Sequence, residues 1–179
     1  MQKQNDFIDI LTKAYGDKEV MDVINKYKMD KPEQKPKDDI VWSGTESGFV
    51  NLTFSDNYIT PEQQAHKTEG KLYLNSMSFD FHPFLTAAEK VDVPFGIHKE
   101  MTFKDLVALL GEAEYMDDNY SEEKKTFRQI WVRKKEDGTR YRVVVRFDND
   151  EAQKVNHLGI FTYNDSTEYR AVPNTLKPL

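Results

Sequence analysis

Two alternating runs on either side of a tight turn constrain the fold of this chain most. Residues 127–135 read FRQIWVRKK, residues 139–147 read TRYRVVVRF, and the turn between them contains Asp137-Gly138. An Asp-Gly pair between alternating runs is a strong signal for a two-stranded antiparallel hairpin. Because side chains alternate along a strand, the second run has an apolar face and a largely cationic face. These faces comprise Tyr141, Val143, Val145 and Phe147 on one side and Arg140, Arg142, Val144 and Arg146 on the other.

A short helix with clear ends is predicted just before this hairpin. Thr102 and Asp105 have the spacing of an N-terminal capping box, and Gly111 is suited to a helix C-terminus. An isolated helix of fewer than roughly 12 residues is marginal in water. This helix therefore needs its caps, and its apolar residues need a sheet to pack on. Those residues are Phe103, Leu106, Val107 and Leu110.

The N-terminal half shows a similar order of elements. Apolar spacing predicts a helix over residues 7–15 that ends at Gly16, and a second helix over 18–27 with Asp17 as its N-cap. A polar loop follows, then a hairpin with strands at 41–42 and 49–54. Residues 57–70 are polar and predict a long loop.

The next strand is predicted over residues 71–81. Strict alternation places two sets of side chains on opposite faces. They are Leu72, Leu74, Ser76 and Ser78 on one face and Tyr73, Met77, Phe79 and Phe81 on the other.

Together these elements predict an α+β fold, an antiparallel sheet with short helices packed on one face. We divide it into two helix-plus-sheet halves, residues 1–90 and 91–179, within one compact unit. Each half has a helix ending in glycine and then a strand bearing tryptophan, Trp42 or Trp131. The sequence leaves open whether the halves are a divergent duplication.

Composition narrows the function classes. The chain has 179 residues, no cysteine, and a formal charge of −6. The lack of thiols excludes disulfides, thiolate metal sites and cysteine nucleophiles. The negative charge argues against a nucleic-acid partner, because such affinity comes from neutralising phosphates with Lys and Arg. We expect no membrane segment and a cytoplasmic location.

Catalytic groups are sparse. His82 follows Asp80 by two residues, and His98 lies just beyond a turn, so an enzyme using His82 or His98 as general base or metal ligand is an open alternative. Neither histidine has the spacing of a zinc motif. We predict no catalytic residue, metal or cofactor. The face bearing Arg140, Arg142 and Arg146, with Arg133 and Lys135 as candidates opposite it, is either a solvated surface or an anion-binding or partner-binding surface.

An acidic run with interleaved aromatic residues is the sharper feature. Residues 112–123 read EAEYMDDNYSEE and contain no basic residue. Carboxylates attract a basic partner, and tyrosine supplies adaptable contact area. The run is either a solvated loop or a partner-binding surface. Under the second interpretation its binding residues are Glu112, Glu114, Tyr115, Asp117, Asp118, Tyr120, Glu122 and Glu123.

With these features the chain resembles the cytoplasmic immunity proteins of bacterial polymorphic toxin systems, of the contact-dependent inhibition and Maf types. The resemblance covers about residues 40–163. It is carried by SGFVNLTF (47–54), KLYLNSMSFDF (71–81), VPFGIHKEMTFKDLVALLGEA (93–113), QIWVRK (129–134) and YRVVVRF (141–147). Val93 and Ala113 depart from the Leu and Pro of the family pattern.

The resemblance implies a binding protein that neutralises a cognate toxin, with no catalytic residues. Many such toxins are basic nucleases, which suits an acidic binding surface. The competing classes are a small hydrolase or metal-dependent enzyme, and a structural module that assembles with a larger complex. The sequence specifies neither the oligomeric state nor the activity of the toxin.

Overall fold

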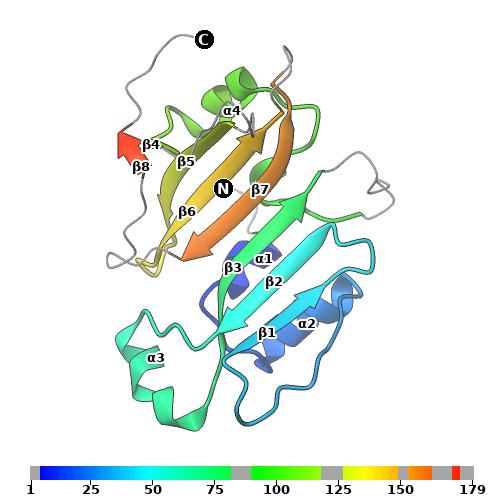
Figure 1. The fold of residues 1–179 in the computed structure, drawn as a ribbon, viewed down its shortest axis with the longest axis vertical. Helices are drawn as coiled ribbons and strands as arrows, with labels where there is room; N and C mark the ends of the chain where they lie inside the picture. The colour runs from blue at the N-terminus through cyan, green and yellow to red at the C-terminus, as the bar shows by residue number, and fades with distance from the viewer. Residues whose placement is uncertain (1–4, 82–89, 118–126, 149–152, 163–170, 174–179) are drawn as a thin grey trace. The chain divides into compact units, whose positions relative to one another are not determined.

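The antiparallel hairpin around Asp137-Gly138 is present in a computed structural model of the chain, which describes residues 5–81, 90–117, 127–148, 153–162 and 171–173. The chain divides into two compact units, Met1–Gly96 and Ile97–Leu179. Each contains an antiparallel sheet with one or more short helices, so the predicted α+β class is confirmed. Figure 1 shows the elements of each unit.

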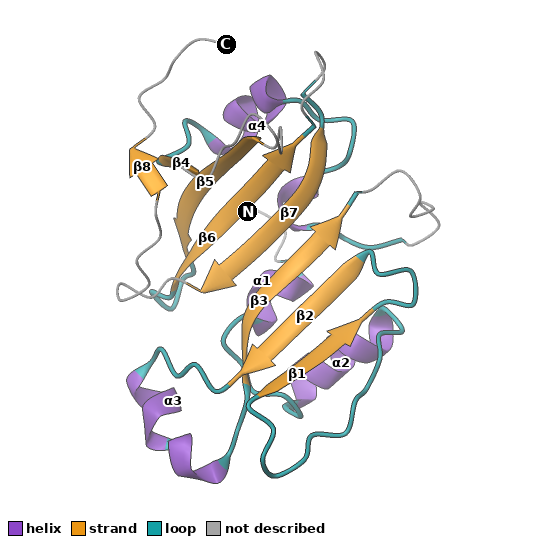
Figure 2. Ribbon diagram, in the orientation of Figure 1, coloured by secondary structure: helices purple, strands orange, loops and turns teal. Residues whose placement is uncertain are grey.

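The first unit contains a three-stranded antiparallel sheet in the order β1-β2-β3. Its elements are α1 (Asp6–Ile10), α2 (Lys18–Lys26), β1 (Ile40–Gly44), β2 (Val50–Ser55), α3 (Pro61–Ala65), the 3-10 turn η1 (Lys67–Glu69), β3 (Tyr73–Asp80) and the 3-10 turn η2 (Pro94–Gly96). Helices α1 and α2 cover one face of this sheet (Figure 2). On that face Phe7 of α1 contacts Phe79 of β3 edge-on, with ring centroids 5.1 Å apart.

In its described residues the second unit has one helix and a five-stranded sheet in the order β7-β6-β5-β4-β8. Its elements are α4 (Phe103–Leu110), β4 (Tyr115–Asp117), β5 (Phe127–Lys134), β6 (Arg140–Phe147), β7 (Val155–Thr162) and β8 (Ala171–Pro173). The predicted apolar residues of β6 are all buried, and Phe103 of α4 contacts Phe147 at 5.9 Å between ring centroids. Helix α4 has the predicted boundaries because its capping box and Gly111 fix both ends.

The predicted alternation of β3 is wrong at one point. Register runs from Thr53 opposite Ser76 to Phe54 opposite Leu74, so Asn75 is an extra residue in a β-bulge. A bulge reverses the facing of the residues on one side of it. Leu74 therefore joins Met77 on the helix-covered face, and both are fully buried.

The predicted first helix is too long. Asn5 caps α1 by accepting the backbone N–H of Phe7, and the helix ends at Ile10. The chain then turns through Thr12, whose φ of 76° is left-handed, and pairs with β3 at Ala14. Pairing with β3 satisfies the backbone groups of this connector, which a longer helix would have satisfied internally.

Asp17 also differs from its predicted role. It occupies the N-cap position of α2, but its carboxylate accepts the N–H of Ala14 at 3.0 Å and makes no cap hydrogen bond to the helix. The side chain therefore closes the turn before the helix.

The segment 57–70, predicted as a loop, contains α3 and η1. Thr60 and Gln63 form a complete capping box, with Pro61 at the first helical position. The Thr-Pro-Glu-Gln sequence was a readable helix start. Gln63 is buried, and its Nε2 donates to the carbonyl of Thr12 at 2.9 Å. This bond fastens α3 to the connector between α1 and α2.

The two tryptophans do not occupy equivalent positions. Trp131 of β5 is fully buried, whereas Trp42 of β1 is 61% exposed. Each unit has a helix followed by a three-stranded meander, β1-β2-β3 or β5-β6-β7. The two units share this order of elements but differ in the direction in which the tryptophan faces. A divergent duplication stays a prediction.

Candidate partner-binding site at the start of the acidic run

The structure describes the first half of the predicted binding run. Glu112 and Glu114 are exposed, Tyr115 is half-buried, and the backbone of Asp117 ends β4. Four other predicted residues lie outside the described part of the chain, namely Asp118, Tyr120, Glu122 and Glu123. The described part of the candidate site therefore extends from α4 to Asp117.

The N-terminus of α4 is closed by a reciprocal cap. The backbone N–H of Thr102 donates to Asp105 Oδ2 at 2.8 Å, and the N–H of Asp105 donates to Thr102 Oγ1 at 3.4 Å. Accepting the Thr102 N–H holds the pKa of Asp105 below its usual value, because that bond favours the ionised carboxylate. The cap fixes where the helix begins. It therefore helps to fix the position of the acidic run that follows the helix.

Two side chains of β5 hold the other end of α4. The indole Nε1 of Trp131 donates to the carbonyl of Gly111 at 2.9 Å. The guanidinium of Arg133 donates through Nη2 to the carbonyl of Leu110. These bonds satisfy carbonyls that the last turn of a helix leaves without intrahelical partners. Gly111 has a φ of 79°, a left-handed value that glycine adopts without steric cost.

Glu114 is part of this same attachment. Its Oε2 accepts the backbone N–H of Val132 at 3.0 Å, and its Oε1 lies 3.2 Å from Arg133 Nη1. Arg133 thus joins the end of α4 to the carboxylate of Glu114, the residue just before β4. Residues 110–114 are held by side chains and backbone of β5 at three successive points, Leu110, Gly111 and Glu114.

The segment directly after Glu114 is strand β4. A solvated loop was one of the two interpretations of the acidic run that contains it. Tyr115 pairs with Ile130 of β5 and, on its other side, with Pro173 of β8. Paired on both sides, the backbone of β4 has a fixed direction where the acidic run begins.

The arginine-rich face of β6 has a different composition from that predicted. Register places Arg128 of β5 and His157 of β7 on either side of Arg146, in one row across three strands. Arg133, by contrast, is used at the end of α4. Like charges opposite one another destabilise a sheet unless they are offset. All members of the row make interactions within the chain, and we assign no site to it.

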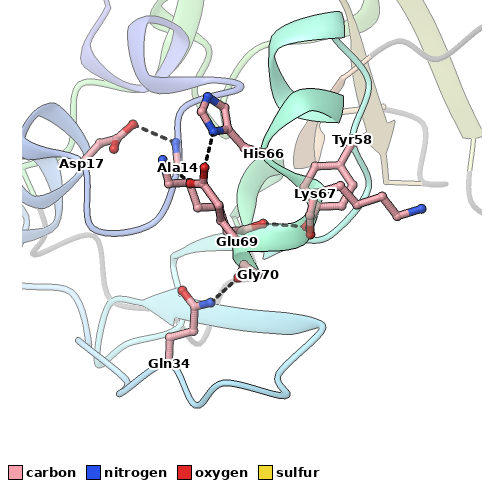
Figure 3. Close-up of polar contacts among 9 residues, drawn as sticks. Ala14, Asp17, Gln34, Tyr58, His66, Lys67, Glu69 and Gly70 are labelled. Atoms are coloured by element: carbon pink, nitrogen blue, oxygen red, sulfur yellow. Dashed lines mark hydrogen bonds and ion pairs between the residues drawn. The ribbon is translucent and has the colours of Figure 1, made fainter.

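Of the four histidines, the structure describes His66, His98 and His157. His66 Nδ1 lies 2.9 Å from Glu69 Oε1 at the end of α3, where the two side chains point toward one another (Figure 3). This bond is the main cause of a lowered pKa at Glu69, with a second contribution from Lys71. His98 is exposed, and His82 lies outside the described residues.

The same close-up shows how the α3 segment is attached. Gln34 Nε2 donates to the carbonyl of Gly70 at 2.8 Å, and the Tyr58 hydroxyl donates to the carbonyl of Lys67 at 3.4 Å (Figure 3). His66 and Glu69 therefore belong to a structural attachment of this segment.

Sequence reasoning missed the residues that hold the site. Trp131 was recognised only as a strand residue, and Arg133 was assigned to the cationic surface. Their partners are carbonyls 20 and 23 residues away along the chain, so no local pattern marks them.

In the described part of the chain, no three His, Cys, Asp or Glu residues are grouped so that they could hold a metal ion. The described helices are all too short or too polar to cross a membrane. No protein-family profile, characterised protein or solved structure matches this chain.

Proposed function

We propose that this chain is a cytoplasmic immunity protein that binds and neutralises a cognate bacterial toxin through residues 112–123. The observation that carries the proposal is the attachment of residues 110–114 to β5 by Trp131, Arg133 and the Val132 backbone. This attachment gives the acidic run a fixed starting point and direction. The sequence resemblance supports the same function.

Fixing the run before binding supports high affinity. Ordering a loop or a rotamer-rich side chain upon binding costs about 0.5–1.5 kcal/mol for each immobilised side chain. A run whose first residues already belong to a sheet avoids part of that cost. An inhibitor that must stay bound to a toxin inside its own cell gains affinity because this cost is avoided.

The charge of the run specifies the chemistry of the partner. Residues 112–123 carry six carboxylates and no basic residue. Opposite charge speeds the encounter of two proteins and excludes partners of like charge. The proposed partner is therefore a basic protein domain, of which a nuclease-type toxin is the expected example.

A coexpression experiment tests this function. The probe is the C-terminal domain of the protein encoded by the neighbouring upstream gene, which the proposal expects to be a large secreted toxin, produced in cells with and without this chain. We expect the domain alone to stop growth, this chain to restore growth, and the two proteins to copurify.

Growth arrest that this chain does not relieve would contradict the proposal. Relief of toxicity without a stable complex would contradict it as well, and would favour an enzyme acting on the toxin's product. Copurification with a non-toxic domain would favour the assembly-module alternative.

A further inference from the structure

Strand β1 forms an open edge of the sheet in the first unit. Among the described strands it is terminal in the strand order, with β2 as its one neighbour (Figure 2). The hydrogen bonds Thr45 N–H to Val50 carbonyl (3.0 Å) and Asp56 N–H to Asp39 carbonyl (3.2 Å) show which residues of the hairpin face β2. In an antiparallel pair this direction alternates from residue to residue. Val41 and Ser43 thus bond toward β2, and the backbones of Ile40, Trp42 and Gly44 face outward.

One contact confirms that the backbone of Gly44 faces outward, and it occupies one of the outward-facing groups of β1. The carbonyl of Gly44 accepts the N–H of Asp30 at 2.8 Å, from the side away from β2. Across the part of the chain that the structure describes, the backbones of Ile40 and Trp42 have no hydrogen-bond partner. The edge therefore offers both groups of Ile40 and Trp42, and the N–H of Gly44, to an incoming strand.

Along Ile40 and Trp42 this edge lacks the usual protection, whereas its Gly44 end is in contact with Asp30. Native edge strands are commonly protected by lysine, proline, a bulge or an inward-pointing charge. The sequence of β1, IVWSG, contains no charged residue or proline, and its register with β2 is regular. Its central Trp42 is 61% exposed on the face away from α1 and α2, opposite Thr53. An exposed large aromatic beside free backbone groups is a contact site for another chain.

The residues around the edge specify what can bind. Asp38 and Asp39 precede β1 and Glu46 follows it, while residues 38–46 include no basic residue. A second copy of this chain, paired antiparallel about Trp42, would bring Asp38 of one copy toward Glu46 of the other. Like charges facing one another oppose that pairing. A strand with an apolar centre and basic flanks has the complementary charge.

We infer that β1 binds an extended, basic-flanked segment of another protein by antiparallel strand addition. The added strand bonds to the outward groups of Ile40 and Trp42, and an apolar side chain packs on the Trp42 indole. The site lies in the first unit and does not involve residues 112–123. It therefore goes beyond the proposed function, and either can fail without the other.

The probe is a nine-residue peptide with the centre Thr-Val-Tyr-Val-Thr and a Lys-Arg pair at each end, titrated to millimolar concentration. Amide hydrogen exchange and ¹H–¹⁵N shifts are measured by NMR on the full chain. We expect exchange at Ile40, Trp42 and Gly44 to slow at least threefold. Exchange at Val41 and Ser43, which are already bonded to β2, should change little. This alternation distinguishes strand addition from stacking on Trp42 alone.

Two peptides and three variants provide the controls. A peptide with N-methyl groups on its bonding edge, and one with Glu in place of the Lys-Arg pairs, should bind at least tenfold more weakly. Ile40→Pro removes an outward N–H that makes no hydrogen bond to β2, and it should abolish the protection. Trp42→Thr keeps the strand and should weaken binding at least fivefold. Leu109→Thr changes an exposed large apolar side chain on α4, the other one that the described residues contain, and should have no effect.

Several results would overturn the inference. Slowed exchange that does not alternate, or equal binding of the N-methylated peptide, rules out strand addition. If the Glu-flanked peptide binds as tightly as the peptide with Lys-Arg pairs, the inference of a basic partner is wrong. A dimer in sedimentation that Ile40→Pro dissociates makes a second copy the occupant instead. The absence of any change at millimolar peptide excludes the site.

Discussion

Single residues decide where the elements that carry the proposed binding surface begin and end. Thr102 and Asp105 begin α4, Trp131 and Arg133 hold its end, and Gly111 permits the turn between it and β4. None of these side chains belongs to the predicted binding set. Their effect on binding is indirect, through the position of residues 112–117.

Thr102→Ala tests the N-terminal cap. The substitution removes the acceptor of the Asp105 N–H, and loss of such a cap costs about 1 kcal/mol. We expect urea unfolding to show this decrease in the free energy of unfolding. Lys104→Ala, at an exposed position of the same helix, is the matched control and should change stability by less than about 0.5 kcal/mol. Equal effects of both substitutions would contradict the role of the cap.

The pH dependence of the same cap gives a second prediction. Because the folded pKa of Asp105 lies below its usual value of 3.8, its carboxylate stabilises the fold above that pH. This contribution is lost as pH falls through the folded pKa. The stability difference between the wild type and Asp105→Asn should therefore be constant from pH 8 to 5 and shrink below pH 3.8. The Lys104→Ala difference should not show that change, and a parallel response of both variants would contradict the assignment.

At the scale of elements, local sequence patterns predicted some helices and strands correctly and gave no sign of other features. The 127–147 hairpin and α4 were predictable because Asp-Gly and the capping box each act within a few residues. The end of α1 was not, since Leu11 and Ala14 fit a helical stripe as well as a connector paired with β3. The bulge at Asn75 was also hidden, because an inserted residue leaves the apolar alternation only slightly irregular. The start of α3 was readable at Thr60 but was overlooked among polar residues.

The bulge makes a prediction that strict alternation does not. Leu74 lies on the helix-covered face and is fully buried, whereas Ser76 is half-buried on the opposite face. Leu74→Ala should cost about 2–5 kcal/mol, the range for truncating a buried leucine. Ser76→Ala should cost less than about 1 kcal/mol. Urea unfolding of the two variants checks this, and similar small costs would contradict the register.

The attachment of α3 can be tested through Gln63. Its side chain donates to the Thr12 carbonyl and accepts the N–H of Ile59 at 2.8 Å. Gln63→Ala leaves both groups without this partner, and an unsatisfied buried group costs about 1–3 kcal/mol. Hydrogen exchange measured by mass spectrometry should become faster across residues 57–70. Glu62→Ala, on the exposed side of α3, is the control, and unchanged exchange in Gln63→Ala would show that the bond does not hold the segment.

At the scale of the whole molecule, the two proposed surfaces differ in charge from strands β5, β6 and β7, which follow both of them along the chain. Strands β5, β6 and β7 contain no acidic residue, although the chain carries a net charge of −6. The acidic residues are concentrated elsewhere, including the run 112–123 and the flanks of β1. A basic partner is thus attracted to particular segments. The sequence alone gave the sign of this charge, but the fixed start of the acidic run depends on contacts from β5.

The association rate with the proposed toxin partner, measured by stopped flow from 50 to 500 mM salt, tests the central claim most directly. The variant Asp117→Asn, Asp118→Asn, Glu122→Gln, Glu123→Gln changes the net charge from −6 to −2, since each substitution removes one negative charge. The control Glu33→Gln, Asp56→Asn, Glu62→Gln, Glu136→Gln makes the same change at exposed positions outside the run. We predict that the first variant associates at least tenfold more slowly at 50 mM salt and loses most of its salt dependence, while the control changes less than threefold. Equal rates for the two variants would contradict the claim that the acidic run receives the partner.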